Sequence, residues 1–189
     1  MATTIETIAP GFLVAAPTLR DPNFDKTVVL MCVHNDEGAL GLVINRPSPL
    51  SLGDVMVQLG MESAASISQP AMVGGPVALD SGLLLYEADR GSMLRDDEIN
   101  VTERLRLCPS RELLAAISQG RGPEHYLMFL GHSGWGPGQL ETEMAQGAWI
   151  PARMRQELVF EIPVEDRWEE CLRGEGLSPA QFGTSVPQA

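Results

Sequence analysis

The most chemically suggestive stretch of the chain is FLGHSGWGPGQLETE, at residues 129–143. It follows an apolar run and sets Ser133 beside His132 among glycines, where we expect a strand to turn into a helix. Two interpretations are open. Either Ser133 is the nucleophile of a hydrolase, or its hydroxyl satisfies the backbone of a structural turn.

The hydrolase interpretation has two difficulties. The nucleophile turn of α/β-hydrolases reads Gly-x-Ser-x-Gly, and Trp135 stands here in place of the last glycine. The catalytic histidine of those enzymes follows the serine, whereas His132 is the last histidine of this chain. Pairing of Ser133 with His34 or His125 through tertiary contact stays open as an alternative. The pattern favours a structural serine.

The same glycines could present free N–H groups to a phosphate at the start of the following helix. Their spacing matches neither Gly-x-Gly-x-x-Gly nor a Walker loop, and no lysine follows. Glu141 and Glu143 would complement the helix dipole and repel an incoming phosphate. The segment therefore gives little support to a phosphate site.

A metal site would have to use Cys32 and His34, which share one face of an extended strand, together with His125 or His132. Three histidines in 189 residues are sparse, and separate structural roles for them are favoured. We predict no metal, no cofactor and no catalytic residue.

Composition narrows the class of protein. The net charge of -12, from 25 acidic and 13 basic residues, disfavours nucleic-acid binding. Three cysteines without a Cys-x-x-Cys spacing predict reduced, mostly buried thiols. No apolar run approaches the roughly 18 residues of a membrane span, and the N-terminus lacks the basic region of a signal peptide. We expect a cytoplasmic protein without membrane contact.

Hydrophobic patterning predicts an α+β fold, because strands outnumber helices and neighbouring strands are often linked as hairpins. Residues 27–33 are apolar on both faces, as in a central strand, whereas residues 101–107 alternate and predict one solvent-exposed face. We expect one domain over residues 1–189, with loose ends at 1–10 and 178–189. The predicted strands are 11–16, 27–33, 39–44, 71–73, 82–86, 101–107, 125–130, 148–150 and 158–162, and the predicted helices are 51–59, 110–118, 139–146 and 166–173.

Four segments, taken in order, resemble the motifs of the bacterial AlgH/YqgE family. They are residues 11–47, MVGGPV at 72–77, residues 129–150 and residues 158–172. The resemblance implies a single cytoplasmic α+β domain with a mixed, strongly curved, partly barrel-like sheet and short flanking helices. It implies no established biochemical activity, and one member's name suggests an association with the regulation of alginate production.

The third motif usually reads Gly-Tyr-Ala-Gly-Trp in that family, and this chain has His132 and Ser133 at the second and third positions. If relatives manage with tyrosine and alanine, neither side chain can be essential to a shared function. The resemblance thus argues further against a nucleophilic serine.

Most residues that match the family motifs form turns, whose ordinary explanation is maintenance of the fold. Polar and aromatic side chains at strand ends and in loops are different, because they can converge on a ligand. We expect a non-enzymatic regulatory or binding protein whose partner is an unknown protein or small molecule. A hydrolase using Ser133 or His34 is the alternative, and a transcription-associated nucleic-acid binder is a further one. The candidate ligand or partner surface comprises Asn45, Arg46, Gly74, Gly75, Trp135, Gln139 and Glu141.

Overall fold

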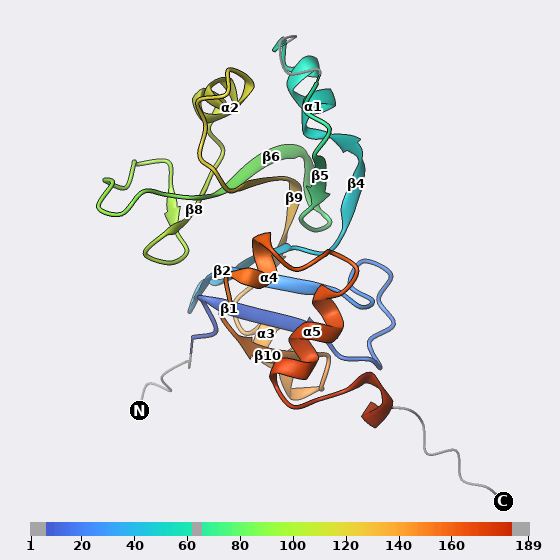
Figure 1. Ribbon diagram of the computed structural model, residues 1–189. Helices are drawn as coiled ribbons and strands as arrows, with labels where there is room; N and C mark the ends of the chain where they lie inside the picture. Colours follow the sequence, from blue (N-terminus) through green and yellow to red (C-terminus); the bar gives the residue numbers. More distant parts are fainter. Residues whose placement is uncertain (1–6, 62–65, 183–189) are drawn as a thin grey trace, which may run out of the picture.

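The structure is a computed structural model that describes residues 7–61 and 66–182. Ten strands form one sheet, with several short helices around it (Figure 1). The strands are β1 Gly11–Ala15, β2 Val28–Asn35, β3 Gly38–Val43, β4 Pro47–Ser51, β5 Pro70–Val73, β6 Val77–Glu87, β7 Ile99–Asn100, β8 Leu105–Cys108, β9 Tyr126–Trp135 and β10 Trp149–Arg153. The helices are α1 Leu52–Gln58, α2 Arg111–Ser118, α3 Gln139–Ala145, α4 Glu157–Phe160 and α5 Arg167–Gly174, followed by a 3-10 turn at Pro179–Phe182.

The sheet has the order β10-β1-β2-β3-β9-β6-β8-β7, with β5 paired to both β4 and β9. The β5–β9 pair is parallel and the other described pairs are antiparallel, so the sheet is mixed and the predicted α+β class is confirmed. In the part of the chain that the structure describes, the end strands β10 and β7 do not pair with each other. The predicted strongly curved, barrel-like sheet is therefore not supported.

Strand β9 joins the two halves of the molecule. Residues 126–130 and His132 pair with β6, two of these residues also pair with β5, and the last three residues pair with β3. In Figure 1, helices α3, α4 and α5 lie with β1, β2 and β10, whereas α1 and α2 lie at the opposite end, near β4, β5, β6 and β8. The largest buried apolar cluster spans both halves, since it includes Phe12 and Leu30 as well as Leu85 and Leu105, and a smaller cluster lies within each half.

Local sequence explains several elements. Residues 28–32 of β2 are buried on both faces, as the apolar run predicts, and Gly38 opens the hairpin to β3 with a φ of 129°. Ser51 caps α1 by accepting a hydrogen bond from the backbone of Asp54, whose carboxylate bonds back to the Ser51 backbone. Ser110 caps α2 in the same way, through the backbone N–H of Leu113.

Two predicted strands differ from the structure. Residues 101–104 form a bend, because the Thr102 hydroxyl accepts the N–H of Leu105. Strand β8 therefore begins only at Leu105. All four residues of β8 are buried, so the predicted solvent-exposed face is wrong for Arg106, whereas Arg104, in the bend, is exposed as predicted. Residues 158–162, predicted as a strand, include most of helix α4, since a short apolar run does not distinguish a buried strand from a buried helix turn.

The segment with Ser133 also differs from its prediction. It was expected to be a turn, but β9 continues through Trp135, and the turn comes after it, before α3. At the chain ends, residues 1–6 and 183–189 lie outside the described residues. Thr7 and Ile8, within the predicted loose N-terminal end, both bond to His34.

Candidate functional site

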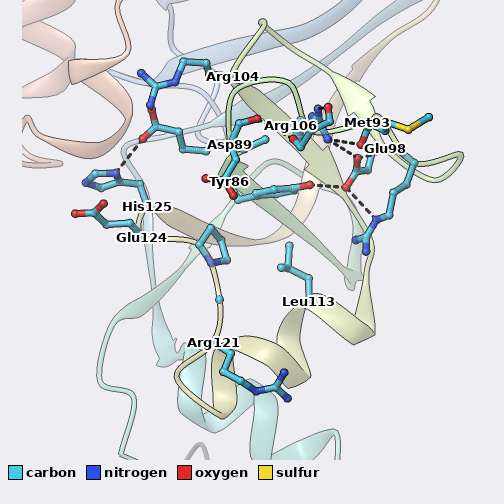
Figure 2. Close-up of a pocket in the computed structure, with 16 residues that line it drawn as sticks. Tyr86, Asp89, Met93, Glu98, Arg104, Arg106, Leu113, Arg121, Glu124 and His125 are labelled. Atoms are coloured by element: carbon cyan, nitrogen blue, oxygen red, sulfur yellow. Dashed lines mark hydrogen bonds and ion pairs between the residues drawn. The ribbon is translucent and has the colours of Figure 1, made fainter.

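A cavity of about 410 Å³ lies at the C-terminal end of β6. We call it the arginine pocket, because Arg95, Arg104, Arg106 and Arg121 line it together with Tyr86. Its wall comes from the end of β6, the segment 88–98, strand β8 and the loop between α2 and β9. Figure 2 shows Tyr86 between two groups of charged side chains, with Leu113 below its ring.

A buried polar network forms one side of this pocket. Tyr86 and Arg106 are directly opposite each other in the β6–β8 ladder. The Tyr86 hydroxyl donates to Oε1 of Glu98, whose side chain is 1 % exposed. Oε2 of Glu98 accepts from the Arg95 backbone N–H at 2.9 Å and lies 3.3 Å from Nη1 of Arg106. Both carboxylate oxygens of Glu98 are thus engaged.

Arg106 also holds the segment that precedes β7. Its Nη1 donates to the backbone oxygen of Met93 at 2.8 Å, and its Nη2 donates to the backbone oxygen of Ser92. The Nε of Arg106 is buried and has no hydrogen-bond partner among the described residues. A buried donor without an acceptor is uncommon in proteins and calls for an explanation.

On the other side of Tyr86 a second ionic group lines the pocket. The guanidinium of Arg104 contacts Oε1 of Glu87, and Nδ1 of His125 lies 2.9 Å from Oε2 of the same carboxylate. Figure 2 shows these three side chains together, with Glu124 close by. Glu87, like Glu98, therefore has both oxygens occupied.

Three side chains of the pocket, Tyr86, Glu87 and Glu98, have shifted pKa values. Burial and the adjacent Glu98 carboxylate raise the pKa of Tyr86 to about 12. Burial alone would raise the pKa of Glu98, but hydrogen bonds from Arg95 and Tyr86, with the nearby arginine charges, hold it below its ordinary value of 4.5. The pKa of Glu87 is lowered in the same sense, against its burial, by hydrogen bonds and by Arg104. These shifts move each pKa away from neutrality, whereas efficient acid–base catalysis needs a pKa near the working pH.

The residues of the hydrolase alternative lie elsewhere. Ser133 is fully buried in β9, and its hydroxyl donates to the backbone oxygen of Gly74 at 3.1 Å. His34 accepts the N–H of Ile8 at Nδ1, at 3.2 Å, and its Nε2 lies 2.8 Å from Oε1 of Glu141. No bond links Ser133 to an imidazole within residues 7–61 and 66–182. The geometry fits a structural serine, in a strand and not in a turn.

Asn45 and Arg46, from the predicted surface, hold the turn before β2. The Asn45 amide accepts the N–H of Val28 and donates to the backbone oxygen of Lys26, both at 2.8 Å. The Arg46 guanidinium donates to backbone oxygens in the same turn. Arg46 and Gly75 also line one cavity of about 110 Å³, so the structure brings these two predicted residues together.

The rest of the predicted surface does not line that cavity. Trp135 is buried, and its indole N–H donates to Glu143 at 3.0 Å. Gln139 donates to the same Glu143 carboxylate at 2.8 Å, and Glu141 bonds to His34. Gly74 is buried beside β9. A ligand or partner role for the full set of seven residues stays a prediction.

Other chemistry finds little support in the described residues. The described residues contain no group of three histidine, cysteine or acidic side chains that could hold a metal ion. Cys32, Cys108 and Cys171 are free and buried, which confirms the predicted thiols. No described helix has the length and apolar character to cross a membrane.

With this geometry in view, comparison with known proteins places the chain. A family model described as AlgH-like matches residues 12–180. The chain belongs to the AlgH-like family. The resemblance seen in the four sequence segments is thereby confirmed.

Its relatives extend the family assignment to most of the chain. A UPF0301 protein of Anaeromyxobacter dehalogenans is 42% identical over 181 residues, which cover 93% of this chain and 91% of that one. A UPF0301 protein of Vibrio atlanticus is 36% identical over 184 residues, with 94% and 97% covered. The solution structure of the AlgH protein from Pseudomonas aeruginosa has a TM-score of 0.78 and 32% identity, with both chains fully covered. A crystal structure from Corynebacterium diphtheriae, 24% identical with a TM-score of 0.73 over 93% and 92% of the two chains, shares the fold.

The arginine pocket of this AlgH-like chain was missed by sequence reasoning. The sequence predicts Tyr86 as the end of strand 82–86, and Arg104 and Arg106 as part of the solvent-exposed face of a different strand, 101–107. The sequence did contain one signal. Four of the 13 basic residues of this acidic chain lie within 17 positions, namely Arg90, Arg95, Arg104 and Arg106. Pairing of β6 with β8 and β9 is what gathers these side chains with Tyr86 and His125.

Proposed function

We propose that this AlgH-like chain is a non-enzymatic binding protein with a regulatory role, and that the arginine pocket takes a small molecule. The observation that carries the proposal is the combination of an open cavity of about 410 Å³ with a buried Tyr86–Glu98–Arg106 network along its wall. Ligand sites are typically concave, with a few fixed polar groups. None of the shifted pKa values provides an acid or base for catalysis near neutral pH.

A second candidate surface lies at the smaller cavity between Arg46 and Gly75. Val77 and Leu79, next to it, are 42% and 55% exposed, and exposed apolar side chains favour contact with a protein. We keep this surface as the proposed partner site.

The three buried, reduced cysteines support a cytoplasmic location, where disulfides are rare.

The test is a ligand-observed NMR screen of the purified protein against neutral, cationic and anionic metabolites. Glu124, exposed on the pocket wall, is replaced by tryptophan to obstruct the cavity. Glu169, exposed on α5, receives the same substitution as the matched control. We expect Glu124→Trp to abolish the binding of a hit and Glu169→Trp to retain it. Absence of any hit, or equal binding by both variants, would overturn the proposal.

A further inference from the structure

The arginines of the pocket keep hydrogen-bond donors that no described group uses. The two carboxylates beside Tyr86, those of Glu87 and Glu98, have all four oxygens engaged by protein groups. A guanidinium carries five N–H donors and no acceptor. Arg104 uses one terminal nitrogen, Nη2, on Glu87. Among the described residues, Arg121 uses only its Nη2, which donates to Gln119. The part of a ligand that meets these arginines must supply acceptors.

The buried Nε of Arg106 points to the same chemistry. Arg106 is 7% exposed and lines the pocket, and its other two nitrogens are bonded to Glu98 and to backbone oxygens. The unpaired Nε can only donate. An acceptor entering from the pocket would satisfy it. A negatively charged acceptor would do so most strongly, because charge-assisted hydrogen bonds exceed neutral ones.

The charges around the pocket limit how much negative charge the ligand carries. Four arginines line it, and the carboxylates of Glu87 and Glu98, each paired with an arginine, offset two of their charges. Asp89 and Glu124 also line it, and their carboxylates oppose an anion. One oxyanion group is therefore a better match than a polyanion such as nucleic acid.

The remaining wall suits a carbon skeleton. Leu113, Gly122 and Pro123 line the pocket, and Figure 2 shows Leu113 directed toward the Tyr86 ring. These groups offer apolar contact and leave the arginines to hold the charged end of a ligand. An inorganic ion would leave this apolar wall unused.

We propose that the arginine pocket binds a small organic molecule through a single oxyanion group, a carboxylate or a phosphate ester, held by Arg106 and Arg121. This inference rests on the proposed binding function and adds the chemical class of the ligand. The apolar wall beside Tyr86 holds the carbon body of that molecule.

Titration calorimetry with two probes tests the inference, butyrate for the carboxylate and butyl phosphate for the phosphate ester. Three variants are compared with the unchanged protein. Arg121→Gln removes a pocket charge, and Arg20→Gln removes an equal charge from the exposed turn after β1. Glu124→Gln removes an opposing charge. Because all three side chains are exposed, we expect the variants to fold, and thermal unfolding checks this.

We expect at least one probe to bind, with Arg121→Gln weakening binding by about tenfold, the usual effect of losing a hydrogen bond to a charged group. Arg20→Gln should leave the affinity nearly unchanged, and Glu124→Gln should tighten it. The probe that binds with the higher affinity identifies the oxyanion as a carboxylate or a phosphate. Equal effects of the two arginine variants would overturn the inference, because the anion would then respond only to overall charge.

The screen above separates this inference from the proposed function. If neutral or cationic compounds bind in the pocket and neither anionic probe does, the oxyanion inference fails and the binding function stands. If no compound of any class binds there, both fail.

Discussion

Nε2 of His34 and Oε1 of Glu141 lie 2.8 Å apart, although 107 residues separate them in the chain. The other ring nitrogen of His34 accepts the backbone N–H of Ile8 at 3.2 Å. Because Nδ1 accepts, Nε2 carries the hydrogen of the neutral ring and donates a hydrogen bond to the carboxylate. One buried imidazole thus ties together β2, the first turn of α3 and the segment before β1.

This contact predicts a stability that falls in acid. The backbone N–H of Glu141 itself, and then His34, hold the pKa of the Glu141 carboxyl below its ordinary value of 4.5. A lowered folded-state pKa contributes stability above the ordinary value, and this contribution is lost as the pH falls through the folded-state value. Urea unfolding at a series of pH values below about 5 should show the loss.

The matched variants for that experiment are Glu141→Gln and Glu169→Gln. We expect Glu141→Gln to reduce the acid decline, since an amide does not titrate, while Glu87 and Glu98, whose pKa values are also lowered, keep part of it. Glu169 is exposed on α5, and its replacement should leave the decline in place. An unchanged acid decline in Glu141→Gln would show that this carboxylate is not responsible.

Gly75 should tolerate substitution far less well than Ser133. Gly75 has a φ of +153°, and a Cβ there would lie 2.3 Å from the carbonyl carbon of His132. Gly75→Ala should cost about 3 kcal/mol or more in the free energy of unfolding, because backbone on both sides must shift. Ser133→Ala loses one hydrogen bond to Gly74 and should cost about 1 kcal/mol. Thermal unfolding of both variants checks the ranking.

A chemical test accompanies this pair. Because the Ser133 hydroxyl is fully buried, a serine-directed phosphonate should form no adduct there. Mass spectrometry of the treated protein would detect one. An adduct on Ser133, absent from Ser133→Ala, would favour the hydrolase alternative over the binding function.

Tyr86 should ionise well above an ordinary tyrosine. Its pKa is raised from 10.0 to about 12 by burial and by Glu98. A raised folded-state pKa contributes stability that is complete below pH 10.0 and is lost as the pH rises toward about 12. Ultraviolet titration should show one phenol ionising near the upper value, and Tyr86→Phe should remove that step. Persistence of the step in Tyr86→Phe would contradict the assignment.

The three thiols should resist modification. Burial raises the pKa of Cys32 to about 12 and that of Cys171 to about 11, and it raises the pKa of Cys108 as well. The reactive species is the thiolate, so a thiol reagent at neutral pH should label none of them in the folded protein. All three should react in urea. Fast labelling of Cys32 in the folded state would contradict its burial.

Local patterns predicted the elements whose cause is local. The central strand β2, its hairpin with β3, and the capped helices α1 and α2 follow from a two-sided apolar run, a polar turn with glycine, and serines at helix starts. Each of these signals acts within a few residues. The same patterning predicted the α+β class, which is confirmed, whereas the four family motifs added the barrel-like sheet, which is not supported.

The errors arose where distant residues decide the local structure. Residues 131–135 continue β9, although the glycines by themselves favour a turn. The strand continues because β3 pairs with its last three residues and Gly75 packs closely against His132. Arg106 alternates with apolar neighbours as a surface residue would, but Glu98 and two backbone oxygens draw it inward. A buried ion pair needs its partner, and the partner is not visible from periodicity.

The sequence by itself thus determined the class of fold, the family, the reduced thiols and the turns and caps that bound most elements. The tertiary structure alone decided which polar side chains meet. Ser133 became a buried strand residue, His34 found Glu141, and Tyr86, Glu98 and Arg106 came together at one pocket. The physical reason is that propensities and capping act between near neighbours, whereas a site is assembled by strand pairing and burial over long separations in the chain.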